Sequence, residues 1–426
     1  IAGTGAGANA LAHVTQGVIA IAAGQNVTID AGNGVTLITP VNTVNGDIAI
    51  KTVNGKVDTS GADVVIASQN GGVSLDSANG TILLPPVLKV AGDLALRTFG
   101  TLDVNNSLTS QGSITLESRS GAISIGGAPI GANLVADDRV TLLARQGVSQ
   151  GTGFIKAREL VVNNATTQSV TLTNGSNDVE NLSIRSLGAV AYTDANDFET
   201  GVNRSGVLGV EIQGDAVQLT ALAPYSKVRV VSGLKYRTLS ISAGANTPST
   251  VGTVEFVTTS SGDNPAANAA FQGSLRDMIR YANDNASSYL INNSRKQQPQ
   301  MMVFDEDGYA VSEITVRAAL PQFTRTVTFD GGRLESTVSA DRLGLRGNLT
   351  AETGLAFGAG SNESRVTRVA AYGFDAGAGI ALFSGGNVVT DVFAGLMADG
   401  VTRMPNRVGI DVNGTAAIGN MIGDRV

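Results

Sequence analysis

One short unit recurs along this sequence: a turn of Gly, Asn or Asp, followed by three to five residues in which apolar and polar side chains alternate. "GDIAIKT" at 46–52, "GGVSLDS" at 71–77 and "QGSITLES" at 111–118 are examples. Alternation with a period of two indicates a strand with one buried face, and Gly, Asn and Asp favour tight turns. The spacing of roughly 8–12 residues therefore predicts a long array of short strands.

The clearest predicted strands lie before residue 165, and a looser set follows up to residue 256. The first set comprises 27–29, 35–38, 48–50, 64–66, 73–75, 82–84, 94–96, 102–104, 114–116, 123–125, 140–142 and 160–162. The second set comprises 170–172, 182–184, 207–212, 217–219, 228–231, 239–241 and 254–257. Such spacing alone also fits a β-sandwich or a barrel.

We expect an all-β right-handed parallel β-helix, because the strands are uniformly short and few long charged side chains separate them. In this fold each coil gives one strand to each of two or three sheets, and coils stack at roughly 4.8 Å. The stretch "QNVTIDAGNGVTLIT" at 25–39 then contains a corner between two sheets rather than a β-hairpin. An array of β-sandwiches remains the alternative.

Composition excludes several classes of protein. The 426 residues include 53 Gly but no Cys and no Trp, and aromatic residues make up 4%. A disulfide scaffold, Cys-ligated zinc and thiol catalysis are excluded. The net charge of −7 argues against nucleic acid as a partner. The sequence has no apolar run of about 18 residues, so we do not expect a transmembrane protein.

The strand period is broken at "FQGSLRDMIRYANDNASS", residues 271–288, where we predict a short amphipathic helix over about 274–283. Leu275, Met278, Ile279 and Ala282 fall on one face of such a helix. Ser274 is a suitable N-cap, and Asp277 suits the positive end of the helix.

Two families resemble parts of this sequence. "NGDIAIKTVNGKVDTSGADVVIASQNGGVSLDSANGTILL" and "QGSITLESRSGAISIGG" resemble filamentous haemagglutinin-type adhesin repeats over about residues 17–165. "GSLRDMIRYAN", "MMVFD" and "ITVRAALPQFTRTVTFDGG" resemble a segment of large bacterial right-handed β-helix surface proteins, over about 271–426. That family usually has Ala where Met278 stands. The resemblances imply two β-helix sections, with the helix between them or capping the second.

From these patterns we divide the chain into four segments. They are a haemagglutinin-like β-helix at 1–165, a looser β-rich continuation with lateral loops at 166–256, a linker with the capping helix at 257–310, and a second β-helix section at 311–426. The last section ends in the middle of a strand-like pattern, and the chain opens at Ile1. We therefore expect a piece of a longer chain.

Candidate catalytic and metal-binding residues are few. "FDEDGYA" offers Asp305, Glu306 and Asp307 as a weak Ca²⁺ candidate, and "TDANDFE" offers a second acidic group at 194–199. A short acidic motif supplies only two or three of the six to eight oxygens that Ca²⁺ binds, so an acidic turn is the simpler interpretation. His13 is the only histidine, which makes a Ser-His-Asp site hard to assemble. Paired glycosidase carboxylates remain open.

We therefore predict a rod-like structural or adhesive segment of a secreted bacterial cell-surface protein or fibre, without enzymatic activity or a required cofactor. Its expected partners are neighbouring segments of the same chain, identical copies in a filament, and surface glycans. The alternative is a β-helix that binds or cleaves a polysaccharide. Such proteins often stack sugars on exposed aromatic side chains. This chain has seven Tyr, of which Tyr192, Tyr225, Tyr236 and Tyr372 do not recur at coil spacing.

Overall fold

The chain folds as a right-handed parallel β-helix, as predicted, with one short helix, α1 (Leu275–Asp284), among the described residues. The computed structural model describes residues 10–14, 17–126, 131–200, 212–224, 226–230, 234–244, 253–258, 274–284, 300–303, 313–331, 342–348 and 353–423. Two compact units divide the chain. The first unit comprises 1–198, 211–222 and 235–237, and the second comprises 199–210, 223–234 and 238–426.

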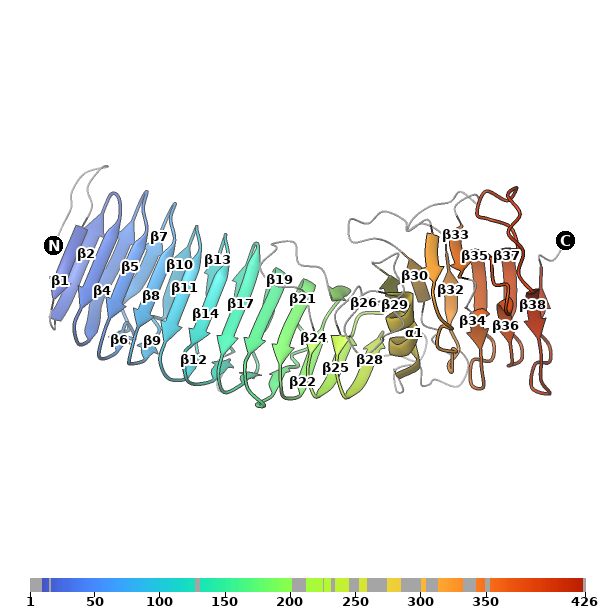
Figure 1. Cartoon of the computed structure of the whole chain (residues 1–426). Coiled ribbons are helices and arrows are strands. Elements are labelled where there is room, and N and C mark those ends of the chain that lie inside the picture. The colour runs from blue at the N-terminus through green and yellow to red at the C-terminus, as the bar shows by residue number, and fades with distance from the viewer. Residues whose placement is uncertain are drawn as a thin grey trace. The chain divides into compact units, whose positions relative to one another are not determined.

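Each coil of the first unit gives one strand to each of three parallel sheets. One coil consists of β11 (Leu94–Thr98), β12 (Leu102–Val104) and β13 (Leu108–Ser110). β11 pairs in parallel with β8 (Val73–Ser77) of the preceding coil and β14 (Ile114–Ser118) of the following coil. These strands lie side by side in Figure 1. Neighbouring coils are therefore joined by ladders of backbone hydrogen bonds.

The remaining strands of the first unit repeat this arrangement. They are β1 (Ala10–Val14), β2 (Gly17–Ala23), β3 (Val27–Ala31), β4 (Val35–Thr43), β5 (Ile48–Thr52), β6 (Val57–Asp58), β7 (Val65–Ser68), β9 (Ile82–Leu83), β10 (Val87–Val90), β15 (Ile123–Ile125), β16 (Leu134–Ala136), β17 (Arg139–Ala144), β18 (Val148–Gln150), β19 (Ile155–Asn164), β20 (Val170–Leu172), β21 (Asp178–Ser186), β22 (Val190–Asp194), β24 (Ile212–Gln213) and β25 (Ala216–Ala221). β23 (Phe198–Thr200) and β27 (Leu234–Lys235) each contain residues of both units.

The stretch at 25–39 is a corner, as predicted. β3 pairs with β1 and β5, whereas β4 pairs with β2, β6 and β7. All of these pairings are parallel, and β3 and β4 belong to different faces of one coil. A hairpin would have required antiparallel pairing between them.

The interior of the first unit is built from side chains that stack coil on coil. Equivalent inward positions are 20 to 26 residues apart in sequence: Val27, Ile48, Val73, Leu94, Ile114, Val140, Leu160 and Leu182. Each of these side chains is at most 2% exposed. Because most strands bury alternate residues against the same narrow core, the period-two pattern in the sequence follows directly.

The interior also holds a column of hydroxyl groups. Ser77, Thr98 and Ser118 lie in register at the ends of successive strands and are fully buried. Their hydroxyls donate hydrogen bonds of 2.6–2.7 Å to the carbonyl oxygens of Gly55, Gly80 and Gly100, respectively. Each hydroxyl thereby supplies a buried donor to a carbonyl group in a turn.

Several corner glycines are required by close approach between coils. A Cβ on Gly71 would lie 2.4 Å from the carbonyl oxygen of Gly46, and one on Gly80 would lie 2.1 Å from that of Gly55. Neither Gly71 nor Gly80 has a positive φ. The glycines at these corners are therefore explained by packing against the preceding coil, and not by turn conformation alone.

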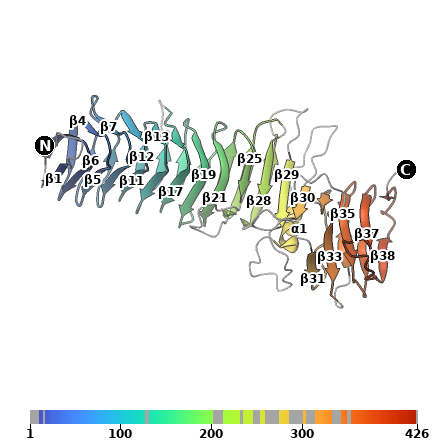
Figure 2. The same cartoon turned by 90° about the horizontal axis from the view of Figure 1, so that it is seen from above.

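The second unit has the same three-sheet plan. One ladder contains β26 (Lys227–Val230), β29 (Thr253–Thr258), β30 (Gln300–Val303), β32 (Thr328–Asp330), β35 (Arg365–Tyr372), β37 (Val388–Ala394) and β39 (Met421–Ile422). The second ladder contains β31 (Glu313–Val316) and β33 (Leu343–Gly347), and it continues through the C-terminal halves of β35 and β37. The third ladder contains β34 (Thr353–Phe357), β36 (Ala378–Leu382) and β38 (Val408–Val412). The strands β33, β35 and β37 are visible side by side in Figure 2. β28 (Thr238–Ala243) also belongs to this unit.

Aromatic side chains fill part of the second unit, in contrast to the largely aliphatic interior of the first unit. Phe323 and Phe357 stack with ring centroids 4.8 Å apart, and Phe329 meets Phe323 edge to face at 6.3 Å. All three are fully buried. The few aromatic residues of the chain therefore include several that serve packing.

The predicted helix is confirmed. Ser274 accepts a hydrogen bond from the backbone N–H of Asp277 at 3.3 Å, and Met278 and Ile279 are fully buried. Arg276 donates to the carbonyl oxygens of Ala318 and Ala319 at 3.0 and 2.7 Å. The helix therefore packs on the second unit through its apolar face and is also held by the two hydrogen bonds of Arg276. It does not hide an open edge of β29, which pairs with β26 and β30 on its two sides.

Candidate functional site

The predicted acidic sites do not form a metal centre in the part of the chain that the structure describes. Asp305, Glu306 and Asp307 lie outside the described residues. In the second acidic group, Asp194 is fully buried, Asp197 is exposed, and Glu199 is 3.7 Å from Arg229. Across the described ranges, no three His, Cys, Asp or Glu side chains gather closely enough to hold a metal ion.

Asp194 lies in the interior of the first unit, where neighbouring residues of the fold use its carboxyl group as a hydrogen-bond acceptor. Its carboxyl accepts hydrogen bonds from the Tyr192 hydroxyl and from the backbone N–H groups of Val179 (3.0 Å) and Asn196 (2.9 Å). Burial raises the pKa of Asp194 to about 7, although these hydrogen bonds lower it. Tyr192 is itself fully buried against Phe198, with ring centroids 5.3 Å apart. The pair faces the core and not solvent.

His13 lies in β1, opposite Asp30 of β3. Its side chain is outside the described residues. β1 itself was not predicted, because the sequence before residue 17 lacks a regular pattern.

One outward position carries mostly charged residues along the ladder of β3, β5, β8, β11, β14, β17, β19 and β21. We call this set of residues the charged column. Its register partners are Asp30, Lys51, Asp76, Arg97, Glu117, Leu143, Asn163 and Arg185. The sign of the charge alternates from Asp30 to Glu117. The Nε of Arg97, for example, is 3.5 Å from Glu117 Oε2. Opposite charges on directly neighbouring strands are mutually stabilising.

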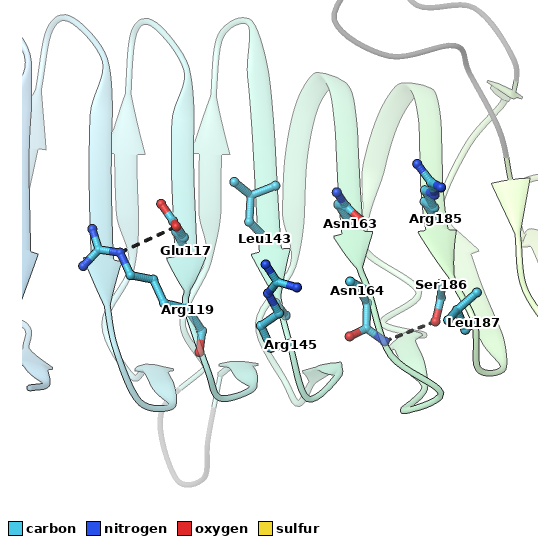
Figure 3. A pocket seen from close by; sticks show the side chains of 12 residues that line it. Glu117, Arg119, Leu143, Arg145, Asn163, Asn164, Arg185, Ser186 and Leu187 are labelled. Carbon is cyan, nitrogen blue, oxygen red and sulfur yellow. Dashed lines mark hydrogen bonds and ion pairs between the residues drawn. The ribbon is translucent and has the colours of Figure 1, made fainter. Parts of the chain in front are cut away.

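The alternation ends at Leu143, and a groove lies over the strands that follow. Its volume is about 710 Å³, and it crosses the ends of β14, β17, β19 and β21. Figure 3 shows the side chains that line it. They are Glu117, Ser118, Arg119, Leu143, Ala144, Arg145, Asn163, Asn164, Ala165, Arg185, Ser186 and Leu187. We call this the arginine groove.

The three arginines of the groove differ in their ion pairs. Arg119 donates two hydrogen bonds to the Asp76 carboxylate, at 2.9 and 3.0 Å, and its Nε is 3.7 Å from Glu117. The hydrogen bonds to Asp76 raise the pKa of Arg119. Arg145 and Arg185 are exposed and make no hydrogen bond or ion pair through their guanidinium groups with any described residue. The groove therefore carries two uncompensated positive charges.

The floor of the groove is rigidly built. Asn164 and Ser186 are fully buried, and the Asn164 amide donates to the carbonyl oxygen of Gln168 at 2.5 Å and to the Ser186 hydroxyl at 3.2 Å. The Asn164 carboxamide oxygen accepts from the backbone N–H of Gly147 at 3.1 Å. These bonds fix the corner between β19 and the next coil, so the side chains above it project from a stable base.

Apolar side chains complete the lining. Leu187 is 53% exposed, Leu143 is half-buried, and Ala165 is exposed. Asn163, between Leu143 and Arg185 in the register, makes no side-chain hydrogen bond with a described residue. The groove thus combines two unpaired cations, one free amide and the aliphatic surface of Leu187, Leu143 and Ala165, a set that suits an anionic ligand with some apolar surface.

This groove was not predicted from the sequence. Its signal is present, however, in the outward positions of the repeat. Once the coils are aligned, the charged column alternates up to Glu117 and then changes to Leu143 and Asn163. This change is visible only when the register between coils is known, because their lengths vary from 20 to 26 residues.

Two arginines of the second unit form ion pairs with carboxylates, in contrast to Arg145 and Arg185. Arg368 binds the Asp330 carboxylate, and Arg342 binds that of Asp391. The Arg342 guanidinium also lies 4.0 Å from the centroid of the Phe393 ring. The positive charges of Arg342 and Arg368 are therefore compensated within the second unit.

No family model matches the sequence, and neither a curated protein nor a solved structure gives a match. Within the described ranges, none of the helical structure has the length and apolar character required to cross a bilayer.

Proposed function

We propose that this chain is a structural and adhesive segment of a large secreted bacterial cell-surface protein or fibre, as its resemblance to haemagglutinin-type repeats implies. The observation that carries the proposal is the stacked construction of the coils. Side chains from Val27 to Leu182 fill the interior of the first unit at every equivalent position. A closed interior of this kind leaves the outer faces as the surface for interactions.

The proposed partners are adjoining segments of the same long chain, identical copies in a filament, and ligands on a cell or matrix surface. A net charge of −7 keeps such a protein soluble. Divalent cations such as Ca²⁺ would bridge its dispersed carboxylates without requiring a dedicated site.

The arginine groove favours one alternative function, the binding of an anionic polysaccharide. Arg145 and Arg185 supply the charge that such a ligand needs. The lining residues include no Phe, Tyr or Trp on which a sugar ring would stack. We therefore place the structural and adhesive function first.

Two measurements test this assignment. Antibodies raised against the chain should label intact cells of the source organism, and brief protease treatment of those cells should remove the label. The purified chain should release no reducing ends or unsaturated products from pectate or alginate, with or without Ca²⁺. Turnover that disappears on changing Asp305 and Asp307 to Asn would overturn the assignment in favour of a lyase.

A further inference from the structure

We infer that the arginine groove binds an extended acidic peptide segment, with Arg145 and Arg185 each pairing with one carboxylate. This inference rests on the proposed function, since it names the class of partner that one outer face of the first unit recognises. It commits to a protein ligand and not to a glycan.

The charge of the groove favours an anionic ligand. Elsewhere in the charged column each cation has acidic register partners, as Arg97 has Asp76 and Glu117. Arg185 instead lies between Asn163 and Gln213, and Arg145 follows a strand whose outward residue is Leu143. Guanidinium groups stay charged at all physiological pH values and bind carboxylates through two parallel hydrogen bonds. Both groups are therefore available to an external carboxylate.

The spacing of the two arginines fits a polypeptide. Ala144 and Ser186 are both register partners of Asn164, so the arginines beside them lie on coils that are two steps apart. Two steps correspond to roughly 10 Å along the coil axis, and Arg145 is also offset from Arg185 by two residues along the strands, so their Cα atoms are roughly 12 Å apart. An extended chain advances about 3.1–3.4 Å per residue, so long acidic side chains three to four residues apart would reach both guanidinium groups.

The apolar part of the lining also favours a peptide. Leu187 and Leu143 offer aliphatic contacts, and Asn163 between the cations can donate to a backbone carbonyl or a carboxylate. A glycan would gain more from aromatic side chains, and none lines the groove.

The mode of binding follows from the sheet. β17 and β19 are paired on both sides, so their backbone groups are already used. A ligand cannot join this sheet as an extra strand and must lie across the strands, held by side chains. Recognition then depends on the charge and spacing of the ligand side chains.

The test is fluorescence anisotropy with the full chain and a labelled peptide of three Glu-Leu-Pro triplets, which favours an extended conformation with Glu at every third position. The same peptide with Gln in place of Glu is the matched control ligand. We expect the Glu peptide to bind and the Gln peptide to bind at least about tenfold more weakly. Binding of the Glu peptide should also weaken as salt is raised.

Two variants assign the binding to the groove. The double variant Arg145→Gln/Arg185→Gln should lose about 10- to 100-fold in affinity, since two charge-assisted contacts are removed. Arg158→Gln is the control, because Arg158 is likewise exposed and unpaired among the described residues but lies outside the groove. Circular dichroism should show that all variants are folded, since each changed side chain is exposed.

Three results would overturn the inference. They are equal affinity for the Glu and Gln peptides, equal affinity of the groove variant and Arg158→Gln, and tighter binding of oligogalacturonate that the groove variant alone abolishes. The last result would assign the groove to a glycan. Because the assay is done in solution, its failure leaves the cell-surface assignment intact, and loss of surface labelling would not affect measured peptide binding.

Discussion

The close packing of glycine corners makes Gly71→Ala a sharp test of how the coils stack. A Cβ at this position would lie 2.4 Å from the carbonyl oxygen of Gly46 and 2.6 Å from its carbon, whereas ordinary contacts begin near 3.4 Å. Both atoms belong to backbone and cannot rotate away. The corner must therefore open by about 1 Å, or the strands that flank it must shift.

The cost follows from what this corner holds together. Overpacking of this kind costs about 1–3 kcal/mol. The Gly46 carbonyl accepts the Ser68 hydroxyl at 2.8 Å, and the Gly71 carbonyl accepts the Gly92 N–H at 2.8 Å. Weakening these bonds adds about 1 kcal/mol. We expect Gly71→Ala to lower the free energy of local unfolding by about 2–4 kcal/mol.

Gly100→Ala is the matched control, since a Cβ there meets nothing within 4 Å and its φ is not positive. It should be neutral or stabilise by up to about 1 kcal/mol. Native-state hydrogen exchange on β5, β8 and β11 is the assay, because coils couple mainly to their neighbours. Equal protection in the two variants would refute this account of the corner glycines.

Three further predictions follow from buried groups. Asp194 has a pKa of about 7 in the folded state and near 4 in the unfolded state. Its contribution to stability is therefore fully present below pH 4 and falls by about 4 kcal/mol as the pH rises from about 4 to about 7. The stability difference between wild type and Asp194→Asn should show this slope in urea titrations at pH 4 and 7.5, and a flat difference would contradict it. Met278→Asp should cost about 2–5 kcal/mol in the second unit, seen as lost protection of α1, whereas unchanged exchange would mean that α1 is not docked. Ser110→Ala should cost about 1–3 kcal/mol, because the Gly92 carbonyl loses its 2.6 Å donor; denaturation at the wild-type midpoint would disprove this.

The sequence predicted the fold through features that act locally. Alternation within strands, Gly and Asn turns, and the helical face of Leu275 and Met278 each reflect contacts of a single element, and these predictions are confirmed. Several short strands, such as β13 and β18, were missed because each has a single apolar residue, whereas the equally short β12 and β15 have an apolar residue at both ends. The domain boundaries at 165, 256 and 310 stay predictions.

The arginine groove could not be predicted because it depends on relations between coils. Arg145, Asn163 and Arg185 are close only through the register of β17, β19 and β21. Whether a cation is paired also depends on side-chain direction, as Arg119 shows by reaching Asp76, 43 residues earlier. Neither relation is encoded in a motif of fixed spacing. The buried hydroxyl column was missed for the same reason, since Ser and Thr at strand ends resemble ordinary turn residues.

The alternating signs in the charged column also favour the correct order of the coils. If one coil were skipped during folding or lost from the gene, Asp76 would face Glu117 where Arg97 now stands, and like charges directly opposite each other are destabilising. If two coils were lost, Lys51 would face Glu117 and the attraction would return. The aliphatic interior, being nearly uniform, would accept either change. Skipping a single coil between Asp30 and Glu117 should therefore cost up to about 1 kcal/mol more than skipping two, and beyond Glu117 this difference disappears.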